Sequence, residues 1–580
     1  MGRRRKDTLI AEPAAGNGIL NRRVFSRSCG RRWCSGMPAA WPTVPIWAAA
    51  RCSTNEREEA VSLRNFTLAV ATVAMAASAN TQQTTDDQLG TVHFLISCTA
   101  VQVKFDRAVA LLHNFFYPET IKAFQAIINE DPDCAIAYWG LAMSELRNPL
   151  VPPFPATNLK AGSKAIQEGK AAKAQTPREA EYLAAIEVFY KDYDQIDHNM
   201  RAGLYEQSMQ HLHKHYPDDS EAAIFYALAL NGAVDFNDKN YTKQLKAAAI
   251  LNEEAKKQPN HPGIAHYLIH SYDFAPLAAM CVSTAQLYDK IAPGAPHALH
   301  MPSHIYSMLG MWDDSVRSNL ASKAAAESHG LPVGHQTDFL VYAFLQRAED
   351  GRAKELVDSV LPISGGLGSD TALAAIPARF ALERGQWDEA SQLSVRASQF
   401  PATQSISYFA RALGAARSGN AAAARAEIVR LDEIEAKLDA AKDDYWAGQT
   451  RIQKQAVAAW VIFSDGQRDK AIAAMRRAAD LDDASEKNVA MENKLVPIRA
   501  LLGELYLAAG MNKEALVEFE ASDKVMPNRF RIIAGAAAAA RESGSAEAAK
   551  RYYRALTALT IGGDGDRPEI EEAQKYLAQD

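Results

Sequence analysis

One turn motif, a glycine followed five residues later by a small residue, recurs along the chain at a regular spacing. Gly351, Gly385 and Gly419 follow one another at a constant interval, and the same interval separates Gly510 from Gly544. Glycine permits the left-handed conformation that ends a helix, and a small residue lets the next helix approach closely. A unit this short cannot bury its apolar face alone, so successive units must stack and share one core. The motif occurs at Gly310–Ser315, Gly385–Ala390, Gly419–Ala424, Gly466–Ala471, Gly510–Ala515 and Gly544–Ala549.

The composition agrees with an extended helical array. The chain has 580 residues, of which 48% are hydrophobic and 23% are charged, so it is too long for one compact core and is not disordered overall. Alanine is abundant, and alternating runs of β-branched residues are scarce. We therefore expect an all-α protein.

The first units add further parts of the same pattern. The segment 110–124 leads to Asp131-Pro132, the segment 137–142 (AYWGLA) opens the next unit, and Pro217, Pro259 and Pro293 close later ones. With these features, residues 101–560 resemble the tetratricopeptide-repeat (TPR) family. The resemblance implies a right-handed superhelical solenoid of antiparallel helix pairs, with about ten to eleven repeats. Proline-rich residues 147–177 are expected to form an insertion loop, residues 80–100 a linker and first helix, and residues 561–580 a capping helix.

Two His-x-x-x-His pairs are the strongest candidates for a functional site. His266 and His270 form the first pair, and His300 and His304 repeat it at the interval that separates the turn glycines. Residues at i and i+4 share one face of a helix, so the pairs should lie on equivalent faces of neighbouring helices. His297 and His335 are further candidate ligands. Imidazole is a common ligand of zinc, copper and iron, although histidines that only line a polar groove explain the pattern as well.

The resemblance also implies a concave groove that holds peptides. The four histidines occupy positions 5 and 9 of their units, which line that groove in TPR proteins. Six other residues are expected near it, and they could bind a peptide terminus or form ordinary ion pairs between repeats. They are Tyr267, Tyr306, Tyr342, Arg379, Arg499 and Glu504.

The chain is also similar to a histidine-rich branch of exported bacterial TPR proteins that has no settled activity. The shared motifs are Leu111-Leu112-His113, His266-Tyr267, the segment 300–306 (HMPSHIY) and Asn528-Arg529-Phe530. Members of that branch usually carry His-Pro after a Glu-Lys pair. Here Glu486-Lys487 is followed by Asn488-Val489, so the resemblance implies that one ligand is missing.

The N-terminal residues predict export. Residues 1–62 carry eleven basic and five acidic side chains and have no periodic apolar pattern, so we expect a non-native or disordered leader, with a nucleic-acid-binding arm as the alternative. Residues 63–79 resemble a signal peptide, with Arg64, an apolar core and Ala77-Ser78-Ala79. If translation starts near Leu63, the protein is periplasmic or secreted; otherwise it is cytoplasmic.

The residues after the signal-like segment bear on compartment and partners. Three cysteines remain, and Cys98–Cys134 is a candidate disulfide, with three buried free thiols as the alternative. Residues 63–580 carry a net charge of −12, which argues against nucleic acid.

Two functions follow as hypotheses. The first is a TPR scaffold that binds a protein or peptide in its groove and has a metal at the histidines. The second is a metal-dependent hydrolase or oxidoreductase with His266, His270, His300 and His304 as ligands. No His-Glu-x-x-His motif supports a zincin protease.

Overall fold

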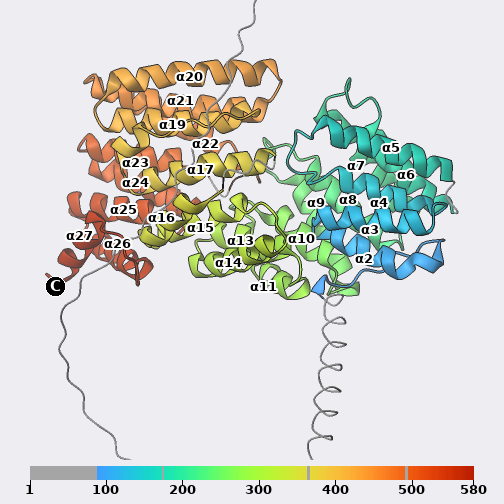
Figure 1. The fold of residues 1–580 in the computed structure, drawn as a ribbon. Coiled ribbons are helices and arrows are strands. Elements are labelled where there is room, and N and C mark those ends of the chain that lie inside the picture. Colours follow the sequence, from blue (N-terminus) through green and yellow to red (C-terminus); the bar gives the residue numbers. More distant parts are fainter. Residues whose placement is uncertain (1–87, 173–175, 362–365, 490, 492–493, 580) are drawn as a thin grey trace, which may run out of the picture. The chain divides into compact units, whose positions relative to one another are not determined.

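The computed structural model describes residues 88–172, 176–361, 366–489, 491 and 494–579, which belong to one compact unit. These residues form helices and turns, with no β-strand among them (Figure 1). The expected leader, 1–62, and the signal-like segment, 63–79, lie outside the described residues. No helix in the described ranges has the length and apolar character needed to cross a membrane.

The first half of the unit contains the helices that later supply the histidines. They are η2 (Thr99–Val101), α2 (Gln102–His113), α3 (Tyr117–Glu130), α4 (Ala135–Glu145), α5 (Ala156–Ala172), α6 (Pro177–Tyr190), α7 (His198–His215), α8 (Ser220–Gly232), α9 (Thr242–Lys257), α10 (Pro262–Tyr272), η3 (Ala278–Cys281), α11 (Val282–Ile291), α12 (Pro296–His300), α13 (Pro302–Met308), α14 (Trp312–Ser328) and α15 (Gly334–Gln346).

The second half continues the series. Its helices are α16 (Asp350–Ser359), α17 (Leu367–Glu383), α18 (Trp387–Ser391), α19 (Pro401–Arg417), α20 (Ala421–Ala440), α21 (Asp444–Ser464), α22 (Arg468–Asp483), α23 (Ile498–Ala508), α24 (Asn512–Val525), α25 (Phe530–Glu542), α26 (Ala546–Leu559) and α27 (Pro568–Leu577).

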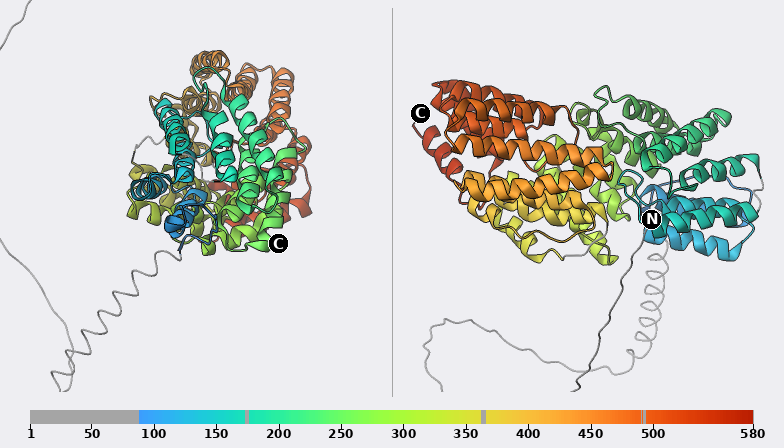
Figure 2. Two further views of the ribbon diagram at one scale, coloured as in Figure 1. Left: turned by 90° about the vertical axis from the view of Figure 1, so that its right-hand side faces the viewer. Right: turned by 90° about the horizontal axis from the view of Figure 1, so that it is seen from above.

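Helices pack mainly against their neighbours in sequence, and the colours of Figure 2 pass gradually from one helix to the next. The turn glycines explain how the chain reverses. Gly310, Gly385, Gly419, Gly466, Gly510 and Gly544 all have φ between 65° and 82°, the left-handed region that side chains with a Cβ disfavour. The all-α prediction is therefore confirmed for the described residues.

Three local expectations were wrong. The insertion 147–177 contains α5, because an alanine- and lysine-rich stretch follows Pro155 and its Gly162 and Gly169 pack closely against Tyr190 and Tyr138. Gly351 lies inside α16, and Ala348 takes the left-handed position instead, with φ 55°.

The third difference concerns the second histidine pair. His300 ends α12 and His304 lies in α13, because Pro302 has no N–H to continue the helix. Met301 between them keeps helical dihedrals. The two histidines therefore still share one face.

Buried side chains form one large core from Leu89 to Met308 and a second from Ala374 to Ala539. Two smaller clusters lie around Trp312–Phe380 and around Phe530–Ala573. The C-terminal helices brace the turn after α13: the Arg529 guanidinium donates to the Ser307 carbonyl (2.9 Å), and Trp312 Nε1 donates to the Asn528 carbonyl (2.6 Å). Two segments that are far apart in the sequence are thereby joined.

Cys98 and Cys134 form a disulfide, while Cys281 is a buried free thiol. The bond joins the start of η2 to the start of α4 and therefore encloses α2 and α3. Of the two alternatives for the cysteines, the disulfide is the one that the structure contains.

Replacing both cysteines by serine should lower the free energy of unfolding. The bond joins residues 36 apart in sequence, and cross-linking a loop of that length stabilises a fold by about 3–4 kcal/mol through the unfolded state. Urea unfolding of the parent and of the Cys98→Ser/Cys134→Ser variant measures the difference. Adding a reductant should destabilise the parent and leave the variant unchanged; equal loss in both would contradict the prediction.

Candidate metal centre

Six histidines from four helices gather in two groups of three. α10 supplies His266 and His270, α12 supplies His297 and His300, α13 supplies His304, and α15 supplies His335 near its first turn. Figure 1 shows α10, α13 and α15 beside one another, in green to yellow-green. We call His266, His270 and His297 the first triad, and His300, His304 and His335 the second triad; within each triad the candidate ligand nitrogens lie within 4.8 Å of one another.

In the first triad, three ring nitrogens converge on one point. His266 Nε2 lies 3.0 Å from His297 Nε2 and 3.1 Å from His270 Nε2. The other nitrogen of His266, Nδ1, lies 2.6 Å from the main-chain carbonyl of His113. A carbonyl can only accept, so Nδ1 carries the hydrogen. In neutral His266 the Nε2 lone pair therefore faces the other two imidazoles.

The second triad repeats this arrangement with two different acceptors. His300 Nδ1–H donates to Asn319 Oδ1 (2.6 Å), and the Asn319 amide is oriented because its Nδ2 donates to the Ser315 carbonyl (2.9 Å). His304 Nδ1–H donates to Asp273 Oδ2 (2.8 Å). Both Nε2 lone pairs therefore point inward, and the two Nε2 atoms are 3.1 Å apart. A cation between them would remove the repulsion of the facing lone pairs.

The two triads are neighbours. The ring centroids of His297 and His300 are 6.1 Å apart, and those of His270 and His304 are 6.3 Å apart. The sequence predicted one cluster of four histidines. The structure instead divides the two pairs between two sites and completes each with a third histidine, His297 or His335.

One phenylalanine packs on each triad. Phe115 lies 4.4–6.1 Å, centroid to centroid, from the three rings of the first triad, and Phe339 lies 4.7–5.2 Å from those of the second. Phe115 has φ 51°, a left-handed conformation that is costly for a residue with a Cβ. An apolar layer next to ligands restricts solvent access and lowers the local dielectric constant.

Burial determines the protonation state of the centre. His266, His270, His300 and His304 are buried, while His297 and His335 are partly exposed. Removal from solvent lowers the pKa of all six imidazoles, and mutual repulsion lowers most of them further; the pKa of His300 falls to about 4. The imidazoles are therefore neutral at physiological pH, the form that binds metals.

A buried ion pair lies behind the second triad. Lys487 Nζ donates to Asp273 Oδ2 (2.7 Å), the same oxygen that accepts from His304, and both side chains are 4% exposed. Burial raises the pKa of Asp273, although Lys487 opposes that shift. The segment in which the resemblance implied a missing ligand thus reaches the centre, and it contributes Lys487 there.

A second buried network supports the first triad. His113 Nε2 and His261 Nε2 each lie 2.9 Å from a different oxygen of Glu221, and Tyr267 lies 2.9 Å from His113 Nδ1. Burial alone would raise the pKa of Glu221, but His261 and His113 lower it overall. Sequence analysis did not find this network, because its members are far apart in the sequence. Its connection to the centre is the His113 carbonyl, which accepts from His266.

The six residues expected along a groove are mostly buried. Tyr267, Tyr306 and Tyr342 are at most 4% exposed, and Arg379 is fully buried and pairs with Asp338. Glu504 pairs with Arg417 and Arg531, and Arg499 with Asp480, Asp483 and Glu518. Ion pairing within the fold, the simpler of the two readings, accounts for the charged residues.

No protein-family model and no curated protein sequence matches this chain. The chemistry of the centre therefore has to follow from its own residues.

The metal-free protein should lose stability as the pH falls below about 6.5, the unfolded pKa of histidine. Between that value and the lowered folded pKa, the unfolded chain binds protons that the folded chain excludes, so the free energy of unfolding decreases; for His300 this window reaches down to about 4. Thermal unfolding in the presence of a chelator, followed from about pH 7.5 to about pH 5, measures the effect. A His300→Gln/His304→Gln variant should show a shallower pH dependence, and an equal slope would contradict this explanation.

Proposed function

We propose that the protein is a metalloprotein whose two histidine triads each hold one transition-metal ion. The observation that carries the proposal is the 3.1 Å separation of His300 Nε2 and His304 Nε2, both with their lone pairs directed inward. Two ligands that bind one tetrahedral ion at about 2.0–2.1 Å lie about 3.3 Å apart. A metal ion would fit this spacing with a small outward movement, and the fixed Nδ1 partners are those expected behind metal-bound imidazoles.

The ligand set favours copper among the three candidate metals. Each triad offers three imidazoles and no carboxylate, whereas non-haem iron sites typically combine two histidines with a carboxylate. Asp273, the nearest acid, is paired with Lys487, so little negative charge is free to balance metal ions. Two cuprous ions bring half the charge of two zinc ions into this buried site, and divalent copper binds nitrogen ligands more tightly than zinc does.

A copper pair of this kind would make the protein an oxidoreductase that binds or activates dioxygen. When bound, the copper ions would supply the redox chemistry. The chain would orient the imidazoles through His113, Asn319 and Asp273, and it would limit water through Phe115 and Phe339. Zinc in the same triads would support a hydrolase instead, which is the second candidate.

We further propose that the helix pairs form a TPR-type solenoid and that the protein is exported. The left-handed glycines at a regular spacing support the first point. The Cys98–Cys134 disulfide supports the second, because such bonds persist in oxidising compartments. A bound peptide remains a prediction from the resemblance; the burial of its expected contact residues does not favour it.

The purified chain should bind about two copper ions after loading and removal of excess metal. Plasma mass spectrometry on three proteins gives the test: the parent, a His266→Ala/His270→Ala variant and a His300→Ala/His304→Ala variant. Each variant should lose the ion of its own triad, because one remaining imidazole cannot hold a metal alone.

The matched control is a His211→Ala/His215→Ala variant. These two exposed histidines lie near Glu181 and form a surface group that could bind metal adventitiously. The control should keep the parent's copper content. Loss of copper only in the control would show that the surface group, and not the centre, binds it.

Replacing Asn319 by alanine should weaken only one of the two ions. The change removes the acceptor of His300 Nδ1–H, and loss of such a partner typically lowers metal affinity by about 10- to 100-fold. Competition with a chromophoric chelator measures both affinities. Equal weakening of both ions, or of neither, would contradict the assignment of His300 to a separate second triad.

A further inference from the structure

A small pocket ends at the metal centre. Its volume is about 40 Å³, and its walls are mainly apolar, from Leu150, Val234, Phe236, Phe274 and Val489. Asn231, His270, Asp273 and Lys487 supply its polar atoms. His270 belongs to the first triad, and Asp273 holds His304 of the second, so the pocket reaches both halves of the centre.

The floor of the pocket has an unsatisfied acceptor. Asp273 Oδ2 accepts from His304 and Lys487, but Asp273 Oδ1 is buried and has no hydrogen-bond partner among the described residues. A buried carboxylate oxygen without a partner is costly. A water molecule or another small ligand in the pocket could supply the missing donor.

The size of the pocket limits what it can admit. One water molecule needs about 10–15 Å³ of such space, so the pocket holds a ligand of about two or three heavy atoms. Its apolar walls suit a small molecule such as dioxygen, which has no strong hydrogen-bonding groups.

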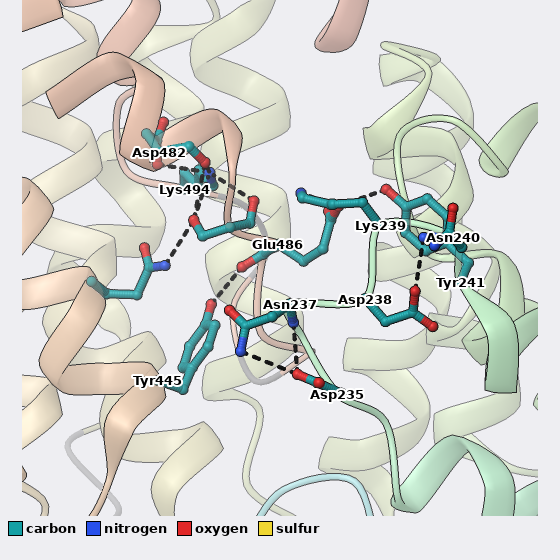
Figure 3. A network of polar contacts seen from close by, with 12 residues as sticks. Asp235, Asn237, Asp238, Lys239, Asn240, Tyr241, Tyr445, Asp482, Glu486 and Lys494 are labelled. Carbon is teal, nitrogen blue, oxygen red and sulfur yellow. Dashed lines mark hydrogen bonds and ion pairs between the residues drawn. The ribbon is translucent and has the colours of Figure 1, made fainter. Parts of the chain in front are cut away.

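The mouth of the pocket is formed by loops that are tied together. Leu150 comes from the loop before α5, Val234 and Phe236 from the loop between α8 and α9, and Val489 from the segment after α22. Glu486, which shortly precedes Val489, accepts hydrogen bonds from Lys239 Nζ and the Tyr241 hydroxyl, both at 2.6 Å. Figure 3 shows Glu486 between these residues and Tyr445, whose hydroxyl donates to the Glu486 carbonyl (2.8 Å).

We infer that this pocket is the route by which a ligand of two or three heavy atoms reaches the metal centre, and that the bonds of Glu486 to Lys239 and Tyr241 hold its mouth closed. The inference rests on the proposed copper centre. Because Glu486 and Lys487 are adjacent, the segment that closes the mouth also supplies the cation that pairs with Asp273.

Azide is a suitable probe, since it has three heavy atoms, binds cupric ions and produces a charge-transfer absorption. The association rate is measured by stopped-flow on the copper-loaded full chain. Val234→Trp should slow azide association by about tenfold or more, because the larger side chain fills the pocket. Glu486→Ala should accelerate it several-fold, because the two loops lose their connection.

Two control variants match these changes. Val517→Trp places the same side chain at an exposed position of α24, where the valine is 62% exposed. Glu435→Ala removes a glutamate of nearly the same exposure as Glu486, 12% against 13%, which binds Arg451 and Lys454 on α21. Both controls should associate with azide at the parent's rate.

The outcomes separate the two proposals. Normal copper content with unchanged azide rates in both Val234→Trp and Glu486→Ala would overturn the access route and leave the copper centre standing. A parent that binds no copper would overturn both. A slowed Val234→Trp, an accelerated Glu486→Ala and unchanged controls would establish the route.

Discussion

The centre depends on hydrogen bonds that fix one nitrogen of an imidazole and so aim the other. His266, His300 and His304 each donate Nδ1–H to an oxygen, and the three acceptors come from His113, Asn319 and Asp273. These acceptors belong to the end of α2, to α14 and to the residue after α10. Holding a few lone pairs inward therefore requires helices from several successive units to be in their places. Without the apolar surroundings, water would compete for the same nitrogens.

The regular spacing of the chain is suited to such a centre. One repeat step returns the chain to an equivalent place on the next helix, so a pair at 266 and 270 is followed by a pair at 300 and 304. Stacking then brings the two pairs together without a dedicated cofactor-binding fold. The two sites still differ in their environment. The first is backed by the Glu221 network, and the second by Asn319 and the Lys487–Asp273 pair.

The periodic features were predictable from the sequence, and the non-periodic ones were not. Repeated glycines and alanine-rich stretches specified an all-α chain, and the i, i+4 spacing identified four of the six candidate ligands, with His297 and His335 as further candidates. The division into two triads was missed because it depends on how α12, α13 and α15 approach one another. Phe115, Phe339 and Asn319 have no signal in the sequence, since their roles arise only from packing. The insertion expected as a loop formed a helix because local helix propensity after Pro155 outweighed the nearby prolines.

The pair of Lys487 with Asp273 has a consequence for the order of biosynthesis. A ribosome releases the N-terminal end first, so all six imidazoles emerge long before Lys487 does. Until then the buried carboxylate has no cationic partner, and the segment that covers the pocket is missing. The centre acquires its final electrostatic surroundings only when the array is almost complete. Chains cut short before Lys487 would expose an open, unbalanced site, whereas full-length chains would close it as one of their last folding events.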